Sequence, residues 1–168
     1  MHARLGEHHI SRRTGRRPGT VVREVMTVSI EENKRVARRV FEEVLNRGNF
    51  AIADELVLDC YRHHPAPPDL PAGAGGFCAI VRMYRSGFPD LQTVVEDMIG
   101  EDDRVAVRFS GAGTHDGEFM GIVPTGRKIR ATGMAWFRFE NGKVAEEWSE
   151  LNTLEILLEI GALPGLPG

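Results

Sequence analysis

Cysteine is scarce in this sequence of 168 residues, which contains only Cys60 and Cys78. Their separation fits neither a zinc-binding pair nor a redox motif. Two such cysteines are more often buried thiols than a disulfide, so we expect both to be buried and the protein to occupy a reducing, cytoplasmic compartment.

Long apolar runs and an excess of one charge are also missing. No stretch approaches the roughly 20 residues that a membrane-spanning helix needs, so we expect no membrane contact. The 21 Lys and Arg residues nearly balance the 24 Asp and Glu residues and give a net charge of -3, which disfavours nucleic acid as a partner. A hydrophobic content of 42% is sufficient for one well-packed domain.

Motifs for cofactors and metals are absent as well. We find no internal repeat and no glycine-rich phosphate-binding motif. Histidines with HxxxH or HExxH spacing are missing, and the adjacent His63 and His64 would diverge on a strand. A metal site built from these two residues and His115 is conceivable but has no support in the spacing. We therefore expect neither a metal nor a cofactor.

Residues 1–28 differ in composition from the rest of the chain, because they are rich in arginine and poor in acidic residues. Such a segment buries too little apolar surface to offset its ordering entropy, so we predict a disordered basic tail. A basic arm for a polyanion is the sharper alternative, and an export signal is disfavoured by the missing apolar stretch. We place a single domain at residues 29–163 and a short tail at 164–168.

Periodicity predicts an α+β fold. Ser29 and Glu32 have capping-box spacing, and apolar residues then recur at helical intervals up to Arg47. Asn141-Gly142 is the strongest hairpin signal. Further helices are expected at 50–57, 77–86 and 154–160, and strands at 59–64, 91–99, 104–114, 128–139 and 143–152. We predict a curved antiparallel sheet of four to six strands packed against three helices, with a proline- and glycine-rich loop at 65–76 that could border a cavity.

The run from Thr114 to Arg127 joins two of these strands and is the most informative stretch. It places His115, Asp116 and Glu118 among glycines that suit turns. Taken alone, such a loop is more often a surface hairpin with solvated charges than a site. Asp90, which precedes a strand, is expected to cap a turn or strand entry rather than to carry chemistry.

An ordered set of short motifs resembles the SnoaL-like polyketide cyclase (ester cyclase) family of the nuclear transport factor 2-like superfamily. The set extends from about Ile30 to Leu163 and includes Phe88-Pro89-Asp90, Thr114-His115, Gly117-Glu118-Phe119, Pro124-Thr125-Gly126-Arg127, Asn141-Gly142-Lys143, Glu146, Trp148 and Ile160-Gly161. The resemblance implies a cone-shaped cavity, a small apolar substrate of secondary metabolism and a homodimer. It also implies acid/base chemistry by an Asp that follows the last-strand Trp, with His115 nearby.

The position of that Asp is occupied here by Asn152, whose neutral amide cannot take a proton from carbon. Strand parity predicts that Val144, Glu146, Trp148, Glu150 and Asn152 share one face, and its mixture of apolar and acidic residues suggests a cavity wall. Glu150, Glu146 or His115 could therefore replace the missing base. A solvated stripe beside one buried Trp is the competing interpretation of this face.

The predicted site follows from these considerations. Its expected catalytic residues are His115, Glu150, Asn152 and Glu146, and its expected substrate-binding residues are His63, Trp148, Trp136, Phe119 and Met134. We predict cofactor-independent ring closure, isomerisation or epoxide opening on a bulky apolar molecule. Asn152 supports one alternative, a ligand-binding domain that has lost catalysis, and a purely structural dimerisation module is another.

Overall fold

The computed structural model describes residues 29–164, so the predictions for residues 1–28 and 165–168 lie outside the described part of the chain. Within it, helices and strands alternate in the order expected of an α+β fold. The elements are α1 (Ile30–Arg39), η1 (Val40–Asn46), η2 (Phe50–Ile52), α2 (Ala53–Leu56), β1 (Val57–His64), α3 (Gly73–Gly87), β2 (Gln92–Glu101), β3 (Arg104–Thr114), β4 (Lys128–Glu140), β5 (Lys143–Leu151) and α4 (Thr153–Glu159).

The first helix begins as its sequence signals predict. The Ser29 hydroxyl accepts a hydrogen bond from the Glu32 backbone N–H, which satisfies one of the free donors of the first turn. Val36, Val40 and Phe41 lie on one face and are buried in the core. The second half of this helix, η1, is wound as a π-helix.

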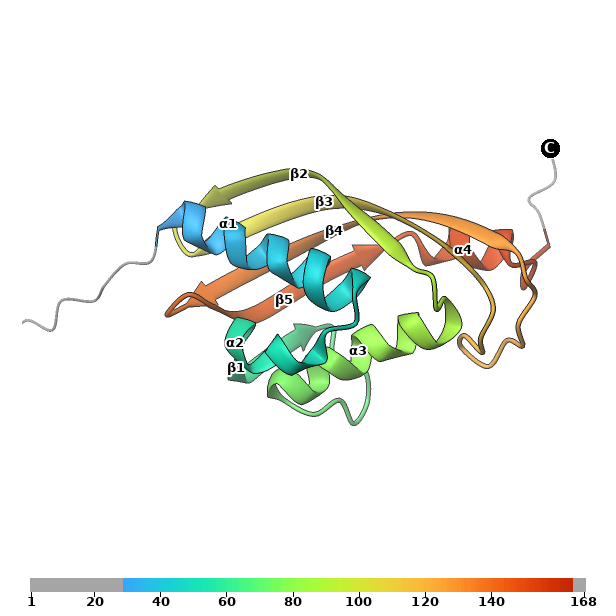
Figure 1. Cartoon of the computed structure of the whole chain (residues 1–168), viewed down its shortest axis with the longest axis horizontal. Coiled ribbons are helices and arrows are strands. Elements are labelled where there is room, and N and C mark those ends of the chain that lie inside the picture. The colour runs from blue at the N-terminus through green and yellow to red at the C-terminus, as the bar shows by residue number, and fades with distance from the viewer. Residues whose placement is uncertain (1–28, 165–168) are drawn as a thin grey trace, which may run out of the picture.

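Five strands form one curved sheet in the order β1-β5-β4-β3-β2 (Figure 1). Strands β2 to β5 are antiparallel neighbours, as predicted. β1 instead runs parallel to β5. The chain therefore returns through α3 and three strands before its last strand meets its first. This long-range pairing carries no local turn signal, so the sequence did not predict it.

Helices α1 and α3 both cover the same face of the sheet (Figure 1). α3 begins at Gly73, four residues earlier than predicted. The glycines at its start resemble a loop in the sequence, but they are part of the helix and allow close packing. A Cβ on Gly76 would lie 1.9 Å from the Pro71 carbonyl oxygen, so only glycine fits this turn of the helix. The main core lies between these helices and the sheet.

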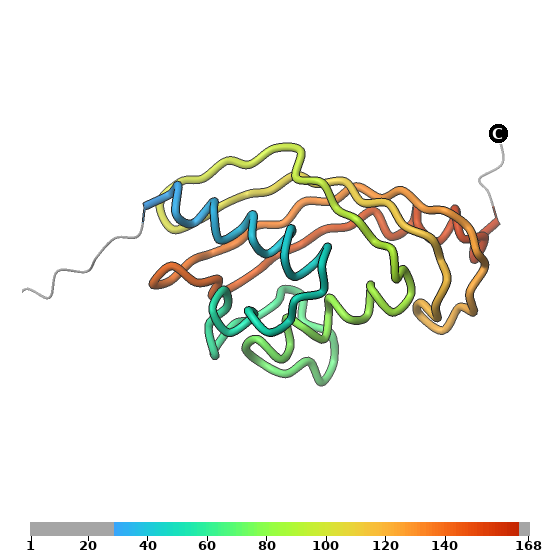
Figure 2. The backbone as a smooth tube through the Cα atoms, viewed as in Figure 1, coloured from blue at the N-terminus to red at the C-terminus, as the bar shows by residue number. Residues whose placement is uncertain are grey.

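The stretch from Thr114 to Arg127 carries exposed charges at Asp116 and Glu118, but it is anchored to the core by the buried His115 and Phe119. It curls around the C-terminal end of α3 (Figure 2), where the Gly117 N–H donates to the Gly87 carbonyl. A Cβ on Gly117 would lie 1.8 Å from the Ser86 carbonyl oxygen. Phe119, from the same loop, joins a second buried cluster that closes this end of the molecule. The family-like motif therefore has a structural explanation in this chain.

Two smaller predictions can be compared directly with the structure. Cys78 is buried, but Cys60 is exposed on β1, so the expectation of two buried thiols is wrong for Cys60. Asp90 accepts hydrogen bonds from the backbone N–H and the hydroxyl of Thr114, at 2.6 and 2.8 Å, which confirms a capping role.

No helix among residues 29–164 is long and apolar enough to cross a membrane.

Candidate active site

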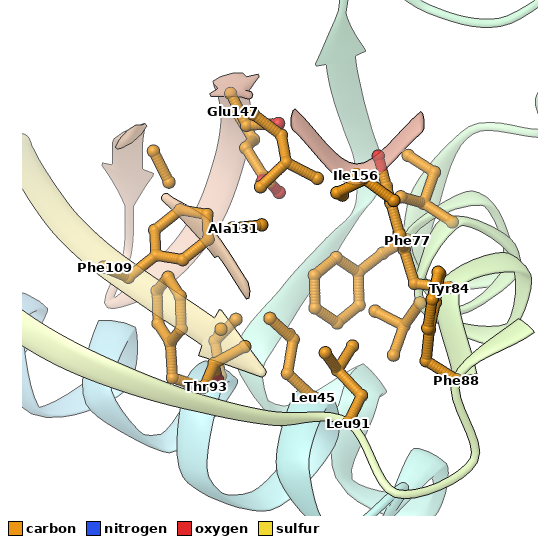
Figure 3. A pocket seen from close by; sticks show the side chains of 18 of the residues that line it. Leu45, Phe77, Tyr84, Phe88, Leu91, Thr93, Phe109, Ala131, Glu147 and Ile156 are labelled. Carbon is orange, nitrogen blue, oxygen red and sulfur yellow. The ribbon is translucent and has the colours of Figure 1, made fainter. Parts of the chain in front are cut away.

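A cavity of about 110 Å³ lies between the sheet and helices η1 and α3. Space of this size holds several water molecules or part of a small ligand. Aromatic and aliphatic side chains form nearly all of its wall (Figure 3). The apolar lining consists of Val40, Phe41, Leu45, Phe77, Ile80, Val81, Phe88, Leu91, Phe109, Gly111, Ile129, Ala131, Ala135, Phe137, Leu151 and Ile156. The predicted border at 65–76 does not contribute to it.

Four polar side chains complete the lining: Tyr84, Thr93, Glu147 and Ser149. The Thr93 hydroxyl is already engaged, because it donates to the Asn46 side-chain oxygen at 2.7 Å. Glu147 is the single carboxylate among the described lining residues. A mostly apolar cavity with a few placed polar groups is the usual form of a small-molecule site.

A β-bulge decides which residues of β5 face this cavity. Phe139 pairs with Val144, whereas Arg138 pairs with Glu146, so Ala145 is an extra residue on β5. An extra residue moves every later side chain to the opposite face of the sheet. Consequently the odd-numbered residues Glu147, Ser149 and Leu151 line the cavity. The predicted face of β5 was therefore wrong beyond Val144.

The side chain of Glu147 is half-buried, and the desolvation of its carboxyl group by the surrounding protein raises its pKa above the ordinary value for Glu. Hydrogen bonds from Tyr61 and Ser149 and the nearby His63 favour the charged form, but they do not overcome the effect of burial. The Tyr61 hydroxyl donates to Glu147 Oε2 at 2.8 Å. The result is a carboxyl group that is a stronger base than an ordinary Glu side chain.

Tyr84 is the second titratable group of the cavity wall. Burial, and then the charge of Glu147, raises the pKa of its phenol. The ring lies against Phe119, with centroids 5.7 Å apart. Because it keeps its proton, the Tyr84 hydroxyl is available as a hydrogen-bond donor to a ligand in the cavity.

His63 lies behind Ser149 rather than in the cavity wall. Its Nε2 is 2.9 Å from the Ser149 hydroxyl oxygen, and its Nδ1 is 3.0 Å from the Pro65 carbonyl oxygen. The expectation that His63 lines the cavity is therefore wrong. His63 contacts Ser149, which does line the cavity. His64, its neighbour, points to the opposite face and stacks on Trp148 with ring centroids 4.7 Å apart.

Glu146, Trp148 and Glu150 occupy the outer face of the sheet, away from the cavity, because of the bulge. Glu146 accepts hydrogen bonds from Arg138 at 2.7 and 2.8 Å, and these lower its pKa, with a smaller contribution from His64. A carboxylate held in its charged form by such a pair is a weak base. Glu150 is exposed.

Trp136 and Met134 lie on the same outer face, since Trp136 pairs with Trp148 across the β4–β5 ladder and Met134 pairs with Glu150. Trp136 is 46% exposed and Met134 is 55% exposed. Neither side chain lines the cavity. Trp136 and Met134 were predicted to bind substrate because one is aromatic and the other apolar. In the structure they instead form part of an exposed patch on the outer face.

His115 and Phe119 are buried in the second core rather than exposed to the cavity. The His115 Nδ1 lies 3.0 Å from the Thr125 hydroxyl, and the ring packs against Phe88 with centroids 5.4 Å apart. Its Nε2 has no hydrogen-bond partner within the described residues. Phe88 separates His115 from the cavity, so direct contact of His115 with a ligand would require this ring to move.

Asn152 is an exposed helix cap rather than a cavity residue. Its side-chain oxygen accepts the Glu155 backbone N–H at 3.3 Å, and its amide donates to the Glu155 carboxylate at 2.9 Å. An Asp could accept the same backbone N–H, although it would lose the bond to the Glu155 carboxylate. The Asn therefore does not remove a carboxylate from the cavity of this chain.

The residues that form the polar side of the cavity were missed by sequence reasoning. Glu147 and Ser149 come from β5, and Tyr84 comes from α3. Tyr61, on the neighbouring strand β1, does not line the cavity but donates to Glu147. The available signal was the apolar pair Val144-Ala145, which interrupts the alternation of β5 and is compatible with a bulge. The described residues contain no group of three or more His, Cys, Asp or Glu side chains that could hold a metal ion.

The sequence pattern of the SnoaL-like polyketide cyclase family matches residues 35–160, which include every residue of the cavity wall. The chain belongs to the SnoaL-like polyketide cyclase family. A comparison with curated proteins finds no match.

Solved structures of other SnoaL-like proteins and their neighbours have the same fold. TsrD from Streptomyces laurentii is 25% identical, with a TM-score of 0.74 over 81% of this chain and 99% of TsrD. AclR from Streptomyces galilaeus, described as a candidate hydroxylase, is 30% identical, with a TM-score of 0.69 over 83% of this chain and 87% of AclR. IdmH from Streptomyces antibioticus, described as a candidate polyketide cyclase, is 27% identical, with a TM-score of 0.67 over 77% of this chain and 98% of IdmH.

Proposed function

We propose that this SnoaL-like protein catalyses proton transfer on an apolar small molecule without a cofactor, with Glu147 as the acid/base group. The observation that carries the proposal is the position of Glu147, the one carboxylate that faces the cavity among the described residues. Ring closure, isomerisation and epoxide opening all require a group that takes a proton and returns it.

The surroundings of Glu147 support this role. A carboxylate whose pKa is raised by burial is a stronger base than an exposed one. A Tyr84 hydroxyl that keeps its proton is a suitable donor to an oxyanion formed on the substrate. The apolar wall would exclude water from a reactive intermediate.

The cavity also supports a substrate class. Its wall is lined mainly by phenylalanine and aliphatic side chains and offers few polar partners, so a flat aromatic or polyketide-like ketone fits better than a charged metabolite. The names of the related structures include both a cyclase and a hydroxylase, so the reaction is proposed at the level of proton transfer. The chain has Asn152 outside the cavity, which removes the main argument for a non-catalytic ligand-binding domain.

The proposal is tested by hydrogen exchange next to a carbonyl group. The full chain would be incubated in deuterated water with a panel of aromatic polyketide-like ketones, and deuterium uptake would be followed by NMR. E147Q should slow the exchange by about 100-fold to 10,000-fold, the usual contribution of a positioned acid/base group. E150Q is the matched control, because it alters an exposed carboxylate of the same strand. Equal exchange rates for E147Q and the unmodified protein would refute the proposal.

A further inference from the structure

Ser149 and His63 form a hydrogen-bonded pair at the wall of the cavity. The bulge in β5 places the Ser149 side chain in the cavity lining. His63 lies on the parallel neighbour β1, and its Nε2 is 2.9 Å from the Ser149 hydroxyl oxygen. A serine hydroxyl within hydrogen-bond reach of a histidine, which is itself oriented by a third group, is the arrangement that activates a serine nucleophile.

The third group here is the backbone carbonyl of Pro65, and it determines the tautomer of His63. The carbonyl oxygen, 3.0 Å from Nδ1, can only accept, so Nδ1 must carry the hydrogen. In the neutral imidazole Nε2 is then an acceptor, and the Ser149 hydroxyl donates to it. The basic nitrogen of His63 therefore faces the hydrogen of a hydroxyl group that lines the cavity.

We propose that Ser149 is a nucleophile activated by His63 and that the cavity accepts the acyl part of a small apolar ester. This activity is transfer of an acyl group through a covalent intermediate. It goes beyond the proton transfer proposed for Glu147 and does not depend on it. The mostly apolar wall suits a hydrocarbon acyl chain. Tyr84, in the same wall, has a hydroxyl that keeps its proton and can donate to the oxyanion of the acyl group.

The reaction consists of two balanced steps. In the first, the Ser149 oxygen bonds to the acyl carbon as its hydrogen moves to His63 Nε2. The ester C–O bond then breaks, and the departing alcohol takes that hydrogen. In the second step, water gives a hydrogen to Nε2 as its oxygen bonds to the acyl carbon. The bond between that carbon and the Ser149 oxygen then breaks, and the hydrogen returns to Ser149. The products are an alcohol and a carboxylic acid.

The other two histidines among residues 29–164 do not form such a pair at the cavity. The His64 Nε2 lies 2.9 Å from a carboxylate oxygen of Glu146 on the outer face of the sheet. His115 contacts the Thr125 hydroxyl, but Thr125 does not line the cavity. The combination of a cavity-facing hydroxyl and an oriented imidazole is therefore particular to Ser149 and His63 in this part of the chain.

Phenylmethanesulfonyl fluoride tests the nucleophile, because this apolar reagent sulfonylates activated serine hydroxyls with loss of fluoride. The full chain would be treated with the reagent, and the labelled residue would be located by peptide mass spectrometry. We expect the label on Ser149. H63Q should slow the labelling by about 100-fold to 10,000-fold, the usual contribution of a positioned acid/base group. S110A is the matched control, because the Ser110 hydroxyl donates to Glu96 and does not line the cavity, so its loss should leave the rate unchanged.

Hydrolysis of p-nitrophenyl butyrate then tests transfer of an acyl group. A reaction stopped with acid should contain a butyryl group on Ser149, and release of p-nitrophenolate should fall in S149A but not in S110A. Thermal melts would verify that both variants are folded. Hydrolysis that is equally fast in folded S149A would overturn the acyl-transfer activity.

The labelling experiment can also refute the proposal by itself. An unlabelled Ser149 in the unmodified chain would overturn it without any variant. Equal labelling rates in H63Q and the unmodified chain would show that the hydrogen bond to His63 only links β1 to β5, and this result would overturn the activation of Ser149 by His63.

Discussion

The Tyr61 hydroxyl donates a 2.8 Å hydrogen bond to Glu147 Oε2 across a separation of 86 positions in the sequence. Tyr61 is 1% exposed, so water cannot replace this bond. β1 and β5 are parallel neighbours, and their pairing holds the phenol and the carboxylate together. The most distant strands of the chain therefore supply both partners of the candidate acid/base group.

Y61F should raise the pKa of Glu147 further. The phenylalanine keeps the ring in place but removes a hydrogen bond that favours the charged carboxylate. The side-chain carboxyl ¹³C signal of Glu147 would be followed as a function of pH. Y84F is the control, because the Tyr84 hydroxyl is not among the groups that hydrogen bond to Glu147. An unchanged titration of Glu147 in Y61F would contradict this account.

E147Q should stabilise the fold at high pH relative to the unmodified protein. Burial raises the pKa of Glu147 in the folded state above its unfolded value, so its contribution to stability is fully present below the unfolded pKa. That contribution is lost as the pH rises through the folded pKa. Glutamine cannot ionise, so the Tm of E147Q minus that of the unmodified chain should increase as the pH rises above the unfolded pKa of about 4, by roughly 2–4 °C for each kcal/mol involved.

Thermal melts at a series of pH values check this expectation. E150Q is again the matched control, since its carboxylate is exposed on the same strand. Its Tm should run parallel to that of the unmodified chain over the whole range. A Tm difference for E147Q that is constant with pH would show that Glu147 has the same pKa in the folded and unfolded states.

Asn152→Asp should leave the proposed activity unchanged. The carboxylate would cap α4 as the amide does, because both accept the Glu155 N–H, and it would remain outside the cavity. Asn152→Ala should lower the free energy of unfolding by about 1 kcal/mol through loss of the cap, again without an effect on chemistry. A large gain of turnover in the Asp variant would show that this position reaches the substrate.

The outer face of the sheet leads to a prediction about assembly. Trp136 and Trp148 face each other across β4 and β5 and are 46% and 37% exposed, beside the exposed Met134. The charges within this patch neutralise each other, since Arg138 pairs with Glu146, which leaves little attraction for a charged partner. We propose that a second copy of the chain covers this patch, because a symmetric dimer needs only a self-complementary apolar surface.

Sedimentation measurements test that arrangement. The unmodified chain should sediment as a dimer, and Trp136→Lys should shift the population to monomer without loss of the fold. Val123→Lys is the matched control, because it alters an exposed apolar residue of the β3–β4 loop, away from the patch. A monomeric unmodified chain would contradict the prediction.

Local patterns in the sequence were sufficient for most of the fold. The helical spacing of Val36, Val40 and Phe41 predicted the first helix, and Asn141-Gly142 predicted the β4–β5 hairpin. These signals act within a few residues, so they survive without knowledge of the tertiary structure. The start of α3 was missed because Gly73 and Gly76 fit against backbone that only the folded chain brings close.

The candidate site was not predictable in the same way. Assignment of a face to Glu146 or Glu147 depends on counting alternate residues, and the bulge at Ala145 changes the count. The role of Glu147 also depends on Tyr61, whose partner is defined by the parallel pairing of β1 with β5. Asn152 could have been recognised as a cap, because Glu155 follows at the spacing of a capping box.

The late position of β5 also bears on how the protein is made. A ribosome releases the chain from its N-terminus, and β5, which begins at Lys143, is the last of the described strands to emerge. Until that segment emerges, β1 has no neighbour in the sheet and Tyr61 has no carboxylate to meet. The pairing that holds Tyr61 against Glu147 is therefore completed only after the other four strands of the sheet have been synthesised.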